Sequence, residues 1–384
     1  MTYKFMVRGY NPPVDEADNQ PDWILGFAGS SGGAGKYGYA QNTDRTSWTL
    51  ADYKTSQRRA KFSAAVGKNA SGDGIYVLAQ KLGTHQNQLA VSGNDITDGN
   101  LWTEVSLVAS SNSNDTVQKI LWAADSGGST AGVWMAGTGN GQLFRSTDGA
   151  ANWSELTKGA GQLPTNWETD GGDRKIVRSM ASNGTGQWVI VQDTRIFVST
   201  NDGATFSEVS HGISNIQVIF GIVYTNNSYV IVYDRDDDNK LYVRSAASSD
   251  LTTWSSEVSY SPMVFPDGSA GEIKHVRMAA DSSGRVVFIS PDKQGVGYLN
   301  VNGTTISNNG LLQAMFSNNP SRDIATNGAG VWLVTCEDGT IFESTNNGTS
   351  WTEIVGDDPG AAAEPVPDAS TNINCIASNY YLPL

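Results

Sequence analysis

The sequence contains little cysteine and little histidine. Two cysteines, Cys336 and Cys375, occur among its 384 residues, whereas a small secreted domain held together by disulfides carries more. Both are therefore interpreted as buried thiols. The three histidines belong to no recognisable nucleophile motif, so the sequence does not predict acyl-transfer chemistry.

Long hydrophobic runs are also missing. No apolar run approaches the roughly 20 residues of a membrane-spanning helix, so membrane insertion is not predicted. Residues 1–20 lack the apolar core of a signal peptide, and we expect no signal peptide. Residues 29–36, GSSGGAGK, do not end in the Gly-Lys-Ser/Thr of a phosphate-binding loop. No cofactor is therefore predicted.

Positive charge is scarce. Lysine and arginine number 25 against 39 aspartates and glutamates, which gives a formal net charge of −14. Such an acidic surface repels the phosphates of nucleic acids and anionic membranes. The charge balance therefore argues against a nucleic-acid partner.

Residues that form turns are abundant, and they alternate with short apolar runs. Glycine occupies 42 positions, and runs such as WVIVQ, YVIVY, RVVFIS and VWLVT are separated by turn residues. Long stripes with the 3.6-residue period of a helix are absent. This pattern indicates many short strands, so we predict an all-β fold.

A unit of about 50 residues recurs along the chain. GVWMAGTGNGQLFRSTDGAANW (132–153) matches GVWLVTCEDGTIFESTNNGTSW (330–351) in its Gly-Val-Trp, its Phe, its Ser-Thr and its final Trp. A third copy and four weaker copies align on the same final position. The seven anchors are Trp48, Trp102, Trp153, Phe206, Trp254, Ile306 and Trp351. They predict a single seven-bladed β-propeller of four-stranded antiparallel blades over residues 1–384.

The two ends of the chain are predicted to share a blade. A motif seen in FSAAVG, SMASNG and RDIATNG precedes the next strand of its unit, and it appears once more as NCIASN (374–379), with no anchor after it. The first unit has the strand DWILGF but lacks this motif. We therefore predict that residues 374–384 complete the N-terminal blade and close the ring, because closure removes open sheet edges.

The residues before the anchors follow the pattern Ser-x-Asp/Asn-x-Gly-x-Thr/Ser-Trp. The matches are Ser199, Asn201, Gly203 and Phe206 in one copy, Ser344, Asn346, Gly348 and Trp351 in a second, and Ser146, Asp148 and Trp153 in a third. In the third copy Gly149 stands one place early and Ala150 holds the usual glycine position. The pattern resembles the Asp box, or BNR repeat, of sialidases, some endoglucanases, sortilin-type receptors, a photosystem II assembly factor and phage proteins.

This resemblance implies a sialidase-like propeller fold, with each motif in the turn between the third and fourth strands of a blade. The ligand pocket of those families lies on the opposite face. An Asp or Asn side chain can accept backbone hydrogen bonds in such a turn, and glycine supplies a positive φ. The motif residues and the anchor tryptophans are therefore interpreted as structural, with the tryptophans in the core and not in a sugar platform.

Two groups of residues are candidates for binding. Asp234, Asp236 and Asp238 alternate within DRDDDN (234–239), as calcium ligands often do, but Ser245 stands where a bidentate Glu would be expected. A solvated hairpin is the alternative interpretation. Trp167 and Phe265 are the aromatic residues of two long loops, and we predict that they contact a partner, although such aromatics often only pin a loop. No catalytic residue is predicted.

The leading functional hypothesis is a non-enzymatic structural or adhesion protein, most plausibly in the virion of a bacteriophage, such as its tail. A rigid ring would present loops to another virion protein or to a host surface glycan, and copies of the chain could associate within the assembly. The expected location is the virion, with the cytoplasm as the alternative. Strands rich in Asn, Ser, Thr and Gly and the absence of an export signal favour this hypothesis.

The competing hypothesis is a glycoside hydrolase. A sialidase needs three arginines on the substrate carboxylate, a Tyr nucleophile activated by Glu, and an Asp acid; Arg8, Arg178, Arg235 and Arg277 are available. The other kind of glycoside hydrolase uses two catalytic carboxylates roughly 5 to 10 Å apart. A third possibility is an assembly factor like the photosystem II propeller, but that relative carries a basic groove, and this chain is acidic.

Overall fold

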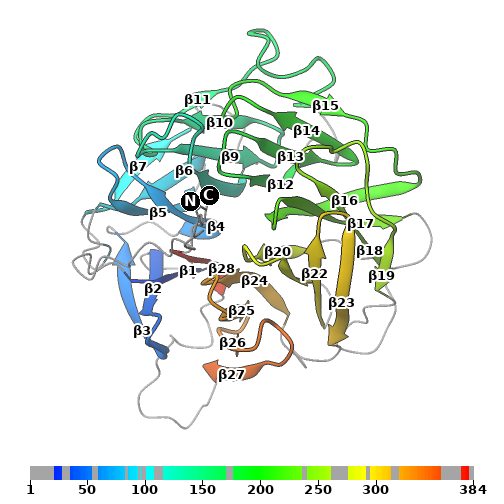
Figure 1. The fold of residues 1–384 in the computed structure, drawn as a ribbon. Helices are drawn as coiled ribbons and strands as arrows, with labels where there is room; N and C mark the ends of the chain where they lie inside the picture. Colours follow the sequence, from blue (N-terminus) through cyan, green and yellow to red (C-terminus); the bar gives the residue numbers. More distant parts are fainter. Residues whose placement is uncertain are drawn as a thin grey trace, which may run out of the picture.

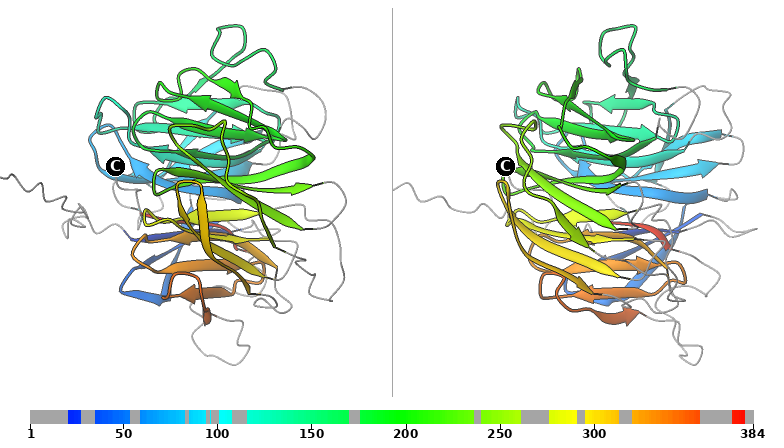
Figure 2. Two further views of the ribbon diagram at one scale, coloured as in Figure 1. Left: turned by 45° about the vertical axis from the view of Figure 1, so that its right-hand side comes forward. Right: turned by 90° about the vertical axis from the view of Figure 1, so that its right-hand side faces the viewer.

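The computed structural model is a ring of seven four-stranded antiparallel sheets, which confirms the predicted seven-bladed β-propeller (Figure 1). Viewed from the side, the sheets follow one another around the ring, and the strands of neighbouring sheets run along similar lines (Figure 2). The structure describes residues 21–27, 35–53, 59–82, 85–93, 96, 101–107, 116–169, 176–235, 240–260, 276–290, 295–312, 320–355 and 373–379.

Four blades come from the first part of the chain and its C-terminal strand. Their strands are given from the innermost outward. Blade 1 contains β28 (Ile373–Ser378), β1 (Trp23–Phe27), β2 (Gly35–Gln41) and β3 (Asp44–Tyr53). Blade 2 contains β4 (Arg59–Lys68), β5 (Gly74–Leu82), β6 (His85–Val91) and β7 (Thr103–Ser106). Blade 3 contains β8 (Val117–Ala123), β9 (Val133–Thr138), β10 (Leu143–Ser146) and β11 (Ser154–Glu155). Blade 4 contains β12 (Val177–Ser182), β13 (Trp188–Gln192), β14 (Arg195–Ser199) and β15 (Ser207–Val209).

The remaining three blades follow in sequence order. Blade 5 contains β16 (Ile216–Thr225), β17 (Ser228–Arg235), β18 (Leu241–Ala247) and β19 (Val258–Tyr260). Blade 6 contains β20 (Arg277–Ala280), β21 (Arg285–Ile289), β22 (Val296–Asn302) and β23 (Thr305–Leu312). Blade 7 contains β24 (Ser321–Thr326), β25 (Trp332–Cys336), β26 (Ile341–Ser344) and β27 (Thr352–Val355).

The hydrophobic core is divided among the spaces between neighbouring blades. The described residues form seven buried clusters, and each cluster joins two adjacent blades. A second strand such as β13 is buried along its whole length because another sheet packs on each of its faces, whereas Ser207 and Glu208 on the outer strand β15 are exposed. This packing explains why the second strands are continuous apolar runs and not alternating ones.

The ring closes between the two ends of the chain, as predicted. β28 pairs antiparallel with β1, and the register places Trp23 opposite Ser378 and Gly26 opposite Cys375. The backbone N–H of Asn379 donates to the carbonyl oxygen of Asp22 (2.9 Å), and the Asn379 amide also donates to the Asp22 carboxylate (2.9 Å). The innermost strands contact one another around the circle, including β24 with β28 and β28 with β4.

The turns between the third and fourth strands share one hydrogen-bond scheme. In blade 4, Ser199 Oγ donates to Asn201 Oδ1 (2.8 Å), and the Thr205 N–H donates to the same oxygen (3.0 Å). Ser344 and Asn346 repeat the first contact in blade 7 (2.9 Å). Four anchor indoles each donate to the carbonyl three residues earlier, over 2.9 to 3.2 Å: Trp48, Trp153, Trp254 and Trp351. The recurrence of this bond in turns of weak sequence similarity supports a structural role for the anchors.

Burial of the anchor tryptophans is not uniform. Trp48 and Trp102 are buried, whereas Trp153, Trp254 and Trp351 are half-buried and pack against the core clusters from their edge. The expectation of five core residues is therefore correct for two of them and too strong for the other three. Trp48 lies within the outermost strand β3, and the other four directly precede the outermost strand of their blades or the segment that leads to it.

The displaced glycine of blade 3 has a steric reason. Gly149 and Ala150 both have positive φ, 74° and 63°, as do Asp202 and Gly203 in blade 4. A Cβ atom on Gly149 would lie 2.4 Å from the Asn69 Cα atom in the preceding blade, so only glycine fits there. Ala150 then occupies the usual glycine position in a left-handed conformation, which costs an L-residue roughly 1–2 kcal/mol.

Candidate functional site

The central channel is lined by the innermost strands, and a backbone irregularity recurs in six of them. A register shift occurs in β4, β8, β12, β16, β24 and β28. Such bulges redirect the side chains that follow them. The residues directly after these shifts, taking the second of the two in β16, are Ser63, Lys119, Ser179, Gly221, Asp323 and Cys375.

Charged side chains from four blades meet in a small cavity at this level. The cavity has a volume of about 20 Å³, and its lining includes Lys119, Arg178, Arg277 and Asp323, which we call the channel charge cluster. The carboxylate of Asp323 accepts a hydrogen bond from the backbone N–H of Ile376 (3.0 Å). Among the described residues the lining therefore holds three basic side chains and one carboxylate, although the protein as a whole is acidic.

Burial shifts the pKa values of two members of the cluster. Removal from water lowers the pKa of Lys119 from its usual value; Asp323 opposes this shift, and the positive charge of Arg277 adds to it. Burial raises the pKa of Asp323, although Lys119 and Arg277 act in the opposite direction. Both side chains keep partial contact with the channel. Burial thus disfavours the charged form of both side chains, and the attraction between them opposes that effect.

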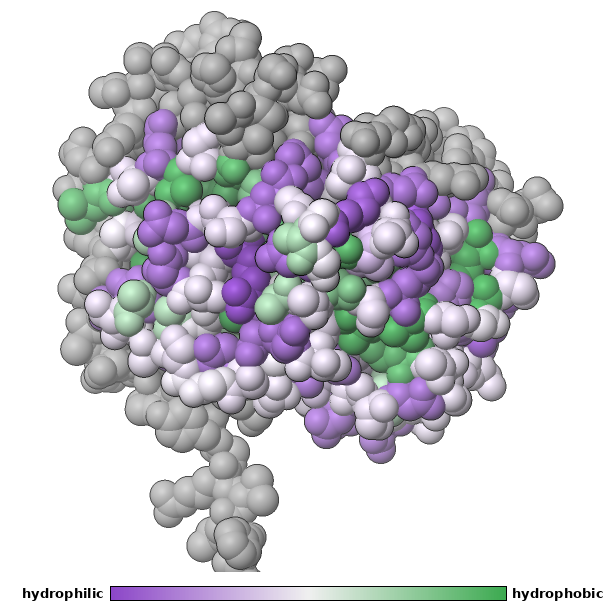
Figure 3. Space-filling model, turned by 90° about the horizontal axis from the view of Figure 1, so that it is seen from above, coloured by the Kyte–Doolittle hydropathy of each residue, from purple (hydrophilic) through white to green (hydrophobic). Residues whose placement is uncertain are grey.

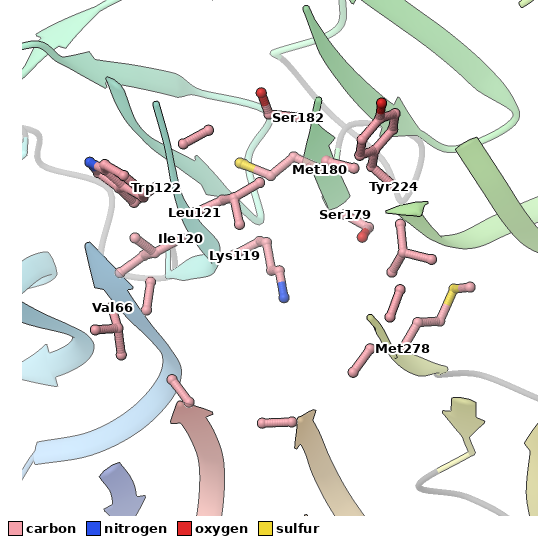
Figure 4. Close-up of a pocket in the computed structure, with 18 of the residues that line it drawn as sticks. Val66, Lys119, Ile120, Leu121, Trp122, Ser179, Met180, Ser182, Tyr224 and Met278 are labelled. Carbon is pink, nitrogen blue, oxygen red and sulfur yellow. The ribbon is translucent and has the colours of Figure 1, made fainter. Parts of the chain in front are cut away.

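A larger chamber, lined by both apolar and polar groups, adjoins the channel charge cluster. Its volume is about 220 Å³, and it shares Lys119, Ser179 and Met278 with the smaller cavity. Figure 4 shows the Lys119 amino group directed into the open centre, with Leu121 and Met180 on neighbouring strands. The chamber extends towards the turns that follow the innermost strands, because Gly184, Thr326 and Ser378 also line it. The apolar lining includes Val66, Ile120, Leu121, Trp122, Met180 and Ile222.

A second concave region lies outside the channel, between blades 5, 6 and 7. This polar groove has a volume of about 770 Å³. Its lining consists mainly of amide and hydroxyl side chains: Asn226, Ser283, Asn300, Asn302, Ser307, Asn346, Asn347 and Thr349, together with Arg285, Tyr298 and Val301. The residues come from turns of three blades and from β22 and β23. The groove is therefore a product of blade packing and not of one loop.

Arg285 organises the floor of the polar groove. Its guanidinium lies 4.6 Å from the centre of the Tyr298 ring, and its Nη1 donates to Asn300 Oδ1 (3.1 Å). Its Nε donates to the backbone carbonyl oxygen of Asn347 in blade 7. Arg285 itself is buried, whereas Asn302 and Ser307 are exposed at the rim. The fixed floor leaves neutral polar groups facing the solvent.

The structure corrects the expectation for Trp167. The side chain is fully buried between blades 3 and 4, its Nε1 donates to the carbonyl oxygen of Gly141 (2.7 Å), and its ring lies 4.7 Å from the ring of Phe197. The indole is therefore not presented to a partner, and the alternative that it pins its loop holds. Phe265 lies outside the described residues, and its proposed contact stays a prediction.

The acidic run is described only in part. Asp234 is buried at the end of β17, and its Oδ1 accepts a hydrogen bond from the backbone N–H of Arg235 (2.7 Å). Asp236 and Asp238 lie outside the described residues, so the metal site there stays a prediction. Within the described residues no group of three or more His, Cys, Asp or Glu side chains is arranged to hold a metal ion.

The arginines named for a sialidase do not gather at one place. Arg178 and Arg277 line the channel, but Arg235 forms an ion pair with Glu257 in blade 5 (2.7 Å). Glu257 also accepts a hydrogen bond from the hydroxyl of Tyr233. This Tyr–Glu pair belongs to β17 and the segment before β19 and is not part of the lining of either channel cavity. Arg8 lies outside the described residues.

Sequence reasoning did not identify Lys119, Asp323 or the polar groove. The repeated motif that includes FSAAVG and RDIATNG could have aligned Ser63 with Asp323, but Lys119 lies before the copy LWAADS, which begins at Leu121. The groove had no linear signal, because its residues are spread from Asn226 in blade 5 to Thr349 in blade 7 and meet only through packing.

The described edge of the ring is mostly polar. Figure 3 shows hydrophilic and weakly polar residues over much of this side, with smaller hydrophobic areas between them. Leu101 is the exposed large hydrophobic residue among those described. In the same part of the chain, no helix has the length and apolar character needed to cross a membrane.

Comparisons with known proteins agree on the architecture. No protein-family model matches the chain, and no curated protein matches it either. Among solved structures, a protein from Lactobacillus plantarum matches with a TM-score of 0.59 at 9% identity, over 93% of this chain and 98% of that one. YCF48 from Cyanidioschyzon merolae matches with a TM-score of 0.50 at 14% identity, over 80% and 87%.

Virginiamycin B lyase from Staphylococcus aureus is a third match, with a TM-score of 0.50 at 12% identity, over 85% of this chain and 95% of that one. Identities this low carry information about the fold and not about activity. Together with the sheet topology, these likenesses identify the chain as a seven-bladed β-propeller.

Proposed function

We propose that the protein is a non-enzymatic structural or adhesion propeller that binds a surface glycan, as a tail-associated component of a bacteriophage virion. The observation that carries the glycan part is the polar groove between blades 5, 6 and 7, with its lining of neutral amides and hydroxyls. Sugars offer many hydroxyl donors and acceptors and no net charge in their common forms. Amide and hydroxyl side chains match both kinds of hydrogen bond.

The frame around the groove is rigid, as a display protein requires. Arg45 forms two hydrogen bonds with the Glu343 carboxylate, 2.8 and 3.1 Å long, between blades 1 and 7. Asp202 in blade 4 accepts hydrogen bonds from the N–H (2.8 Å) and hydroxyl (2.5 Å) of Ser126 in blade 3. These contacts brace neighbouring blades at the same face as the groove. A ligand therefore meets side chains that are already positioned, which reduces the entropy lost on binding.

The virion part of the proposal rests on the sequence. The turn motif of Ser199, Asn201 and Gly203 resembles the Asp box, which also occurs in phage proteins, and its geometry is regular here. Other virion proteins are the proposed partners on the remaining surface, and self-association within the assembly is part of the same proposal.

The glycoside hydrolase remains the alternative. Its two-carboxylate form needs an acid and a base on either side of the scissile bond. Asp323 is the one carboxylate among the described residues that line the two channel cavities, and it is engaged with a backbone N–H. The Tyr233–Glu257 pair lies elsewhere in blade 5. These placements favour binding over turnover.

A glycan array combined with a glycosidase panel tests the proposal on the full chain. We expect at least one glycan to bind without being cleaved. The double variant Asn302→Ala/Ser307→Ala should bind it about tenfold more weakly, because two hydrogen bonds are lost at roughly 0.5–1.5 kcal/mol each. The matched control, Asn166→Ala/Ser207→Ala, removes an exposed amide and hydroxyl from the region of blade 4 and should bind normally. Turnover of a sugar, or equal affinity of both variants, would overturn the proposal.

A further inference from the structure

The polar groove between blades 5, 6 and 7 has a cation at its floor. Among the described residues that line the groove, Arg285 is the charged one, and the others carry amide, hydroxyl or hydrocarbon groups. Arg285 is only 6% exposed, and it forms no ion pair with any other described residue. A charge kept away from water is costly unless hydrogen bonds or an opposite charge satisfy it. The groove floor therefore favours an acidic group on a ligand.

One nitrogen of this guanidinium is not used by the described part of the chain. The Nε atom of Arg285 donates to the backbone carbonyl oxygen of Asn347, and its Nη1 atom donates to Asn300 Oδ1 (3.1 Å). No hydrogen bond to a described residue involves the Nη2 atom. Because the other two nitrogens are fixed by blades 6 and 7, the position of Nη2 is fixed as well. It is a donor that is already in place for a ligand.

The buried carboxylate of Asp281 does not occupy that nitrogen. Its Oδ1 atom accepts hydrogen bonds from the N–H (2.9 Å) and hydroxyl (2.7 Å) of Ser283 and from the backbone N–H of Arg285 (3.0 Å). Burial lowers the pKa of Arg285, whereas Tyr298 and Asp281 act in the opposite direction. Asp281 thus stabilises the guanidinium without forming an ion pair with it, and the Nη2 atom stays available.

Two further donors lie on the same face of blade 6. Asn300 is opposite Arg285 in the sheet, and Tyr298 is two residues before it on β22. Arginine only donates, so the Asn300 oxygen faces it and the Asn300 amide nitrogen is directed elsewhere, without a partner among the described residues. The Tyr298 ring lies against the guanidinium and so close to Gly310 that a Cβ atom there would be 2.4 Å from the Tyr298 hydroxyl oxygen. These three side chains can donate to one acceptor-rich group.

We propose that the polar groove binds a saccharide that carries one acidic group, a carboxylate or a sulfate, which accepts hydrogen bonds from Arg285 and Asn300. This inference rests on the proposed glycan binding and names the class of glycan. Hydrogen bonds from a guanidinium to an anion are roughly twice as strong as neutral ones, so the acidic group sets the position of the sugar. The net charge of −14 repels a ligand with many acidic groups, which favours a single one.

A glycan array of matched pairs tests this inference on the full chain. Each acidic glycan is spotted beside the same glycan after its carboxylate is reduced to an alcohol or its sulfate is removed, and the two kinds of acid form separate sets. We expect a bound glycan with one acidic group, whose neutral counterpart binds about tenfold or more weakly in calorimetry. The set that contains it identifies the acid. Equal affinity within the pairs would overturn the acidic group and leave glycan binding standing, whereas binding of no glycan would overturn both proposals.

A variant at Asn300 places the acidic group in the groove. Asn300→Asp keeps an acceptor for Arg285 but replaces the amide donor with a negative charge, so the roughly tenfold preference for the acidic member of the pair should disappear. Asn215→Asp makes the same change at an exposed residue just before β16 and should leave the preference intact. Asn300→Ala removes the donor without adding charge and provides the measurement if Asn300→Asp fails to fold. A preference that is unchanged in a folded Asn300 variant would overturn the assignment.

Discussion

A chain that ends at Asn372 should have no stable folded state. It lacks β28, so β1 keeps β2 but loses its inner pairing partner, and the innermost strands β24 and β4 lose the strand between them. Ile373, Cys375 and Ile376 are buried in the full chain. Burying one such isoleucine contributes about 1.5–3 kcal/mol, and whole domains are stable by only about 5–15 kcal/mol. We therefore expect the truncation to remove about 5 kcal/mol or more.

Thermal unfolding followed by circular dichroism, with size-exclusion chromatography, measures this effect. The matched control ends at Asn379, so it keeps β28 and the two hydrogen bonds to Asp22. We expect the control to unfold cooperatively at the temperature of the full chain and the shorter chain to aggregate or to show no transition. A cooperative transition of the shorter chain near that temperature would contradict ring closure as the source of stability.

Gly67→Ala should strongly destabilise the protein, because the added methyl group meets two fixed indoles of the next blade. A Cβ atom at Gly67 in β4 would lie 2.3 Å from Trp122 Cγ and 2.4 Å from Trp134 Cζ2. Both indoles are held, because Trp122 donates to Ala131 O (2.8 Å) and Trp134 donates to Lys68 O (3.0 Å). Relief of the overlap needs a shift of blade 3 against blade 2. We expect a loss of about 3 kcal/mol in the free energy of unfolding.

Denaturant unfolding measures that loss. Gly159→Ala is the matched control, because a Cβ atom there meets no other atom within 4 Å and its φ is not in the left-handed region. The control should change the free energy of unfolding by no more than about 0.5 kcal/mol. If the two alanine variants are equally stable, the close packing of the blade 3 tryptophans on β4 is wrong.

Much of the fold could be predicted from the sequence because each blade repeats the same chemistry. The anchors, from Trp48 to Trp351, are aromatic in six units, and the turns before them carry residues whose hydrogen bonds are local. Hydrogen bonds between residues a few positions apart require certain residue types at a fixed spacing. That spacing can be recognised in the sequence even where the rest of the unit differs between blades. The unmatched copy at 374–379 predicted closure for the same reason, since a strand motif without its own blade must join another.

The candidate sites could not be predicted in the same way. Lys119, Arg277 and Asp323 meet only because innermost strands from different blades line one channel at matched levels. A linear pattern does not reveal which side of a bulged strand a residue faces. Trp167 is an error of the other kind, a predicted contact residue that is not exposed. Its position in a loop suggested exposure, but the side chain is buried between blades 3 and 4. Arg235 likewise pairs within blade 5 and not in the channel.

A designed disulfide tests the closed ring most directly. Gly26 on β1 pairs with Cys375 on β28, so Gly26→Cys in a Cys336→Ser background places two thiols on facing positions of neighbouring strands, a separation that a disulfide can span. After mild oxidation, mass spectrometry should show one intramolecular disulfide that joins the peptides containing residues 26 and 375. Free thiols, or disulfides formed only between different chains, would contradict the seven-bladed ring closed by its two chain ends.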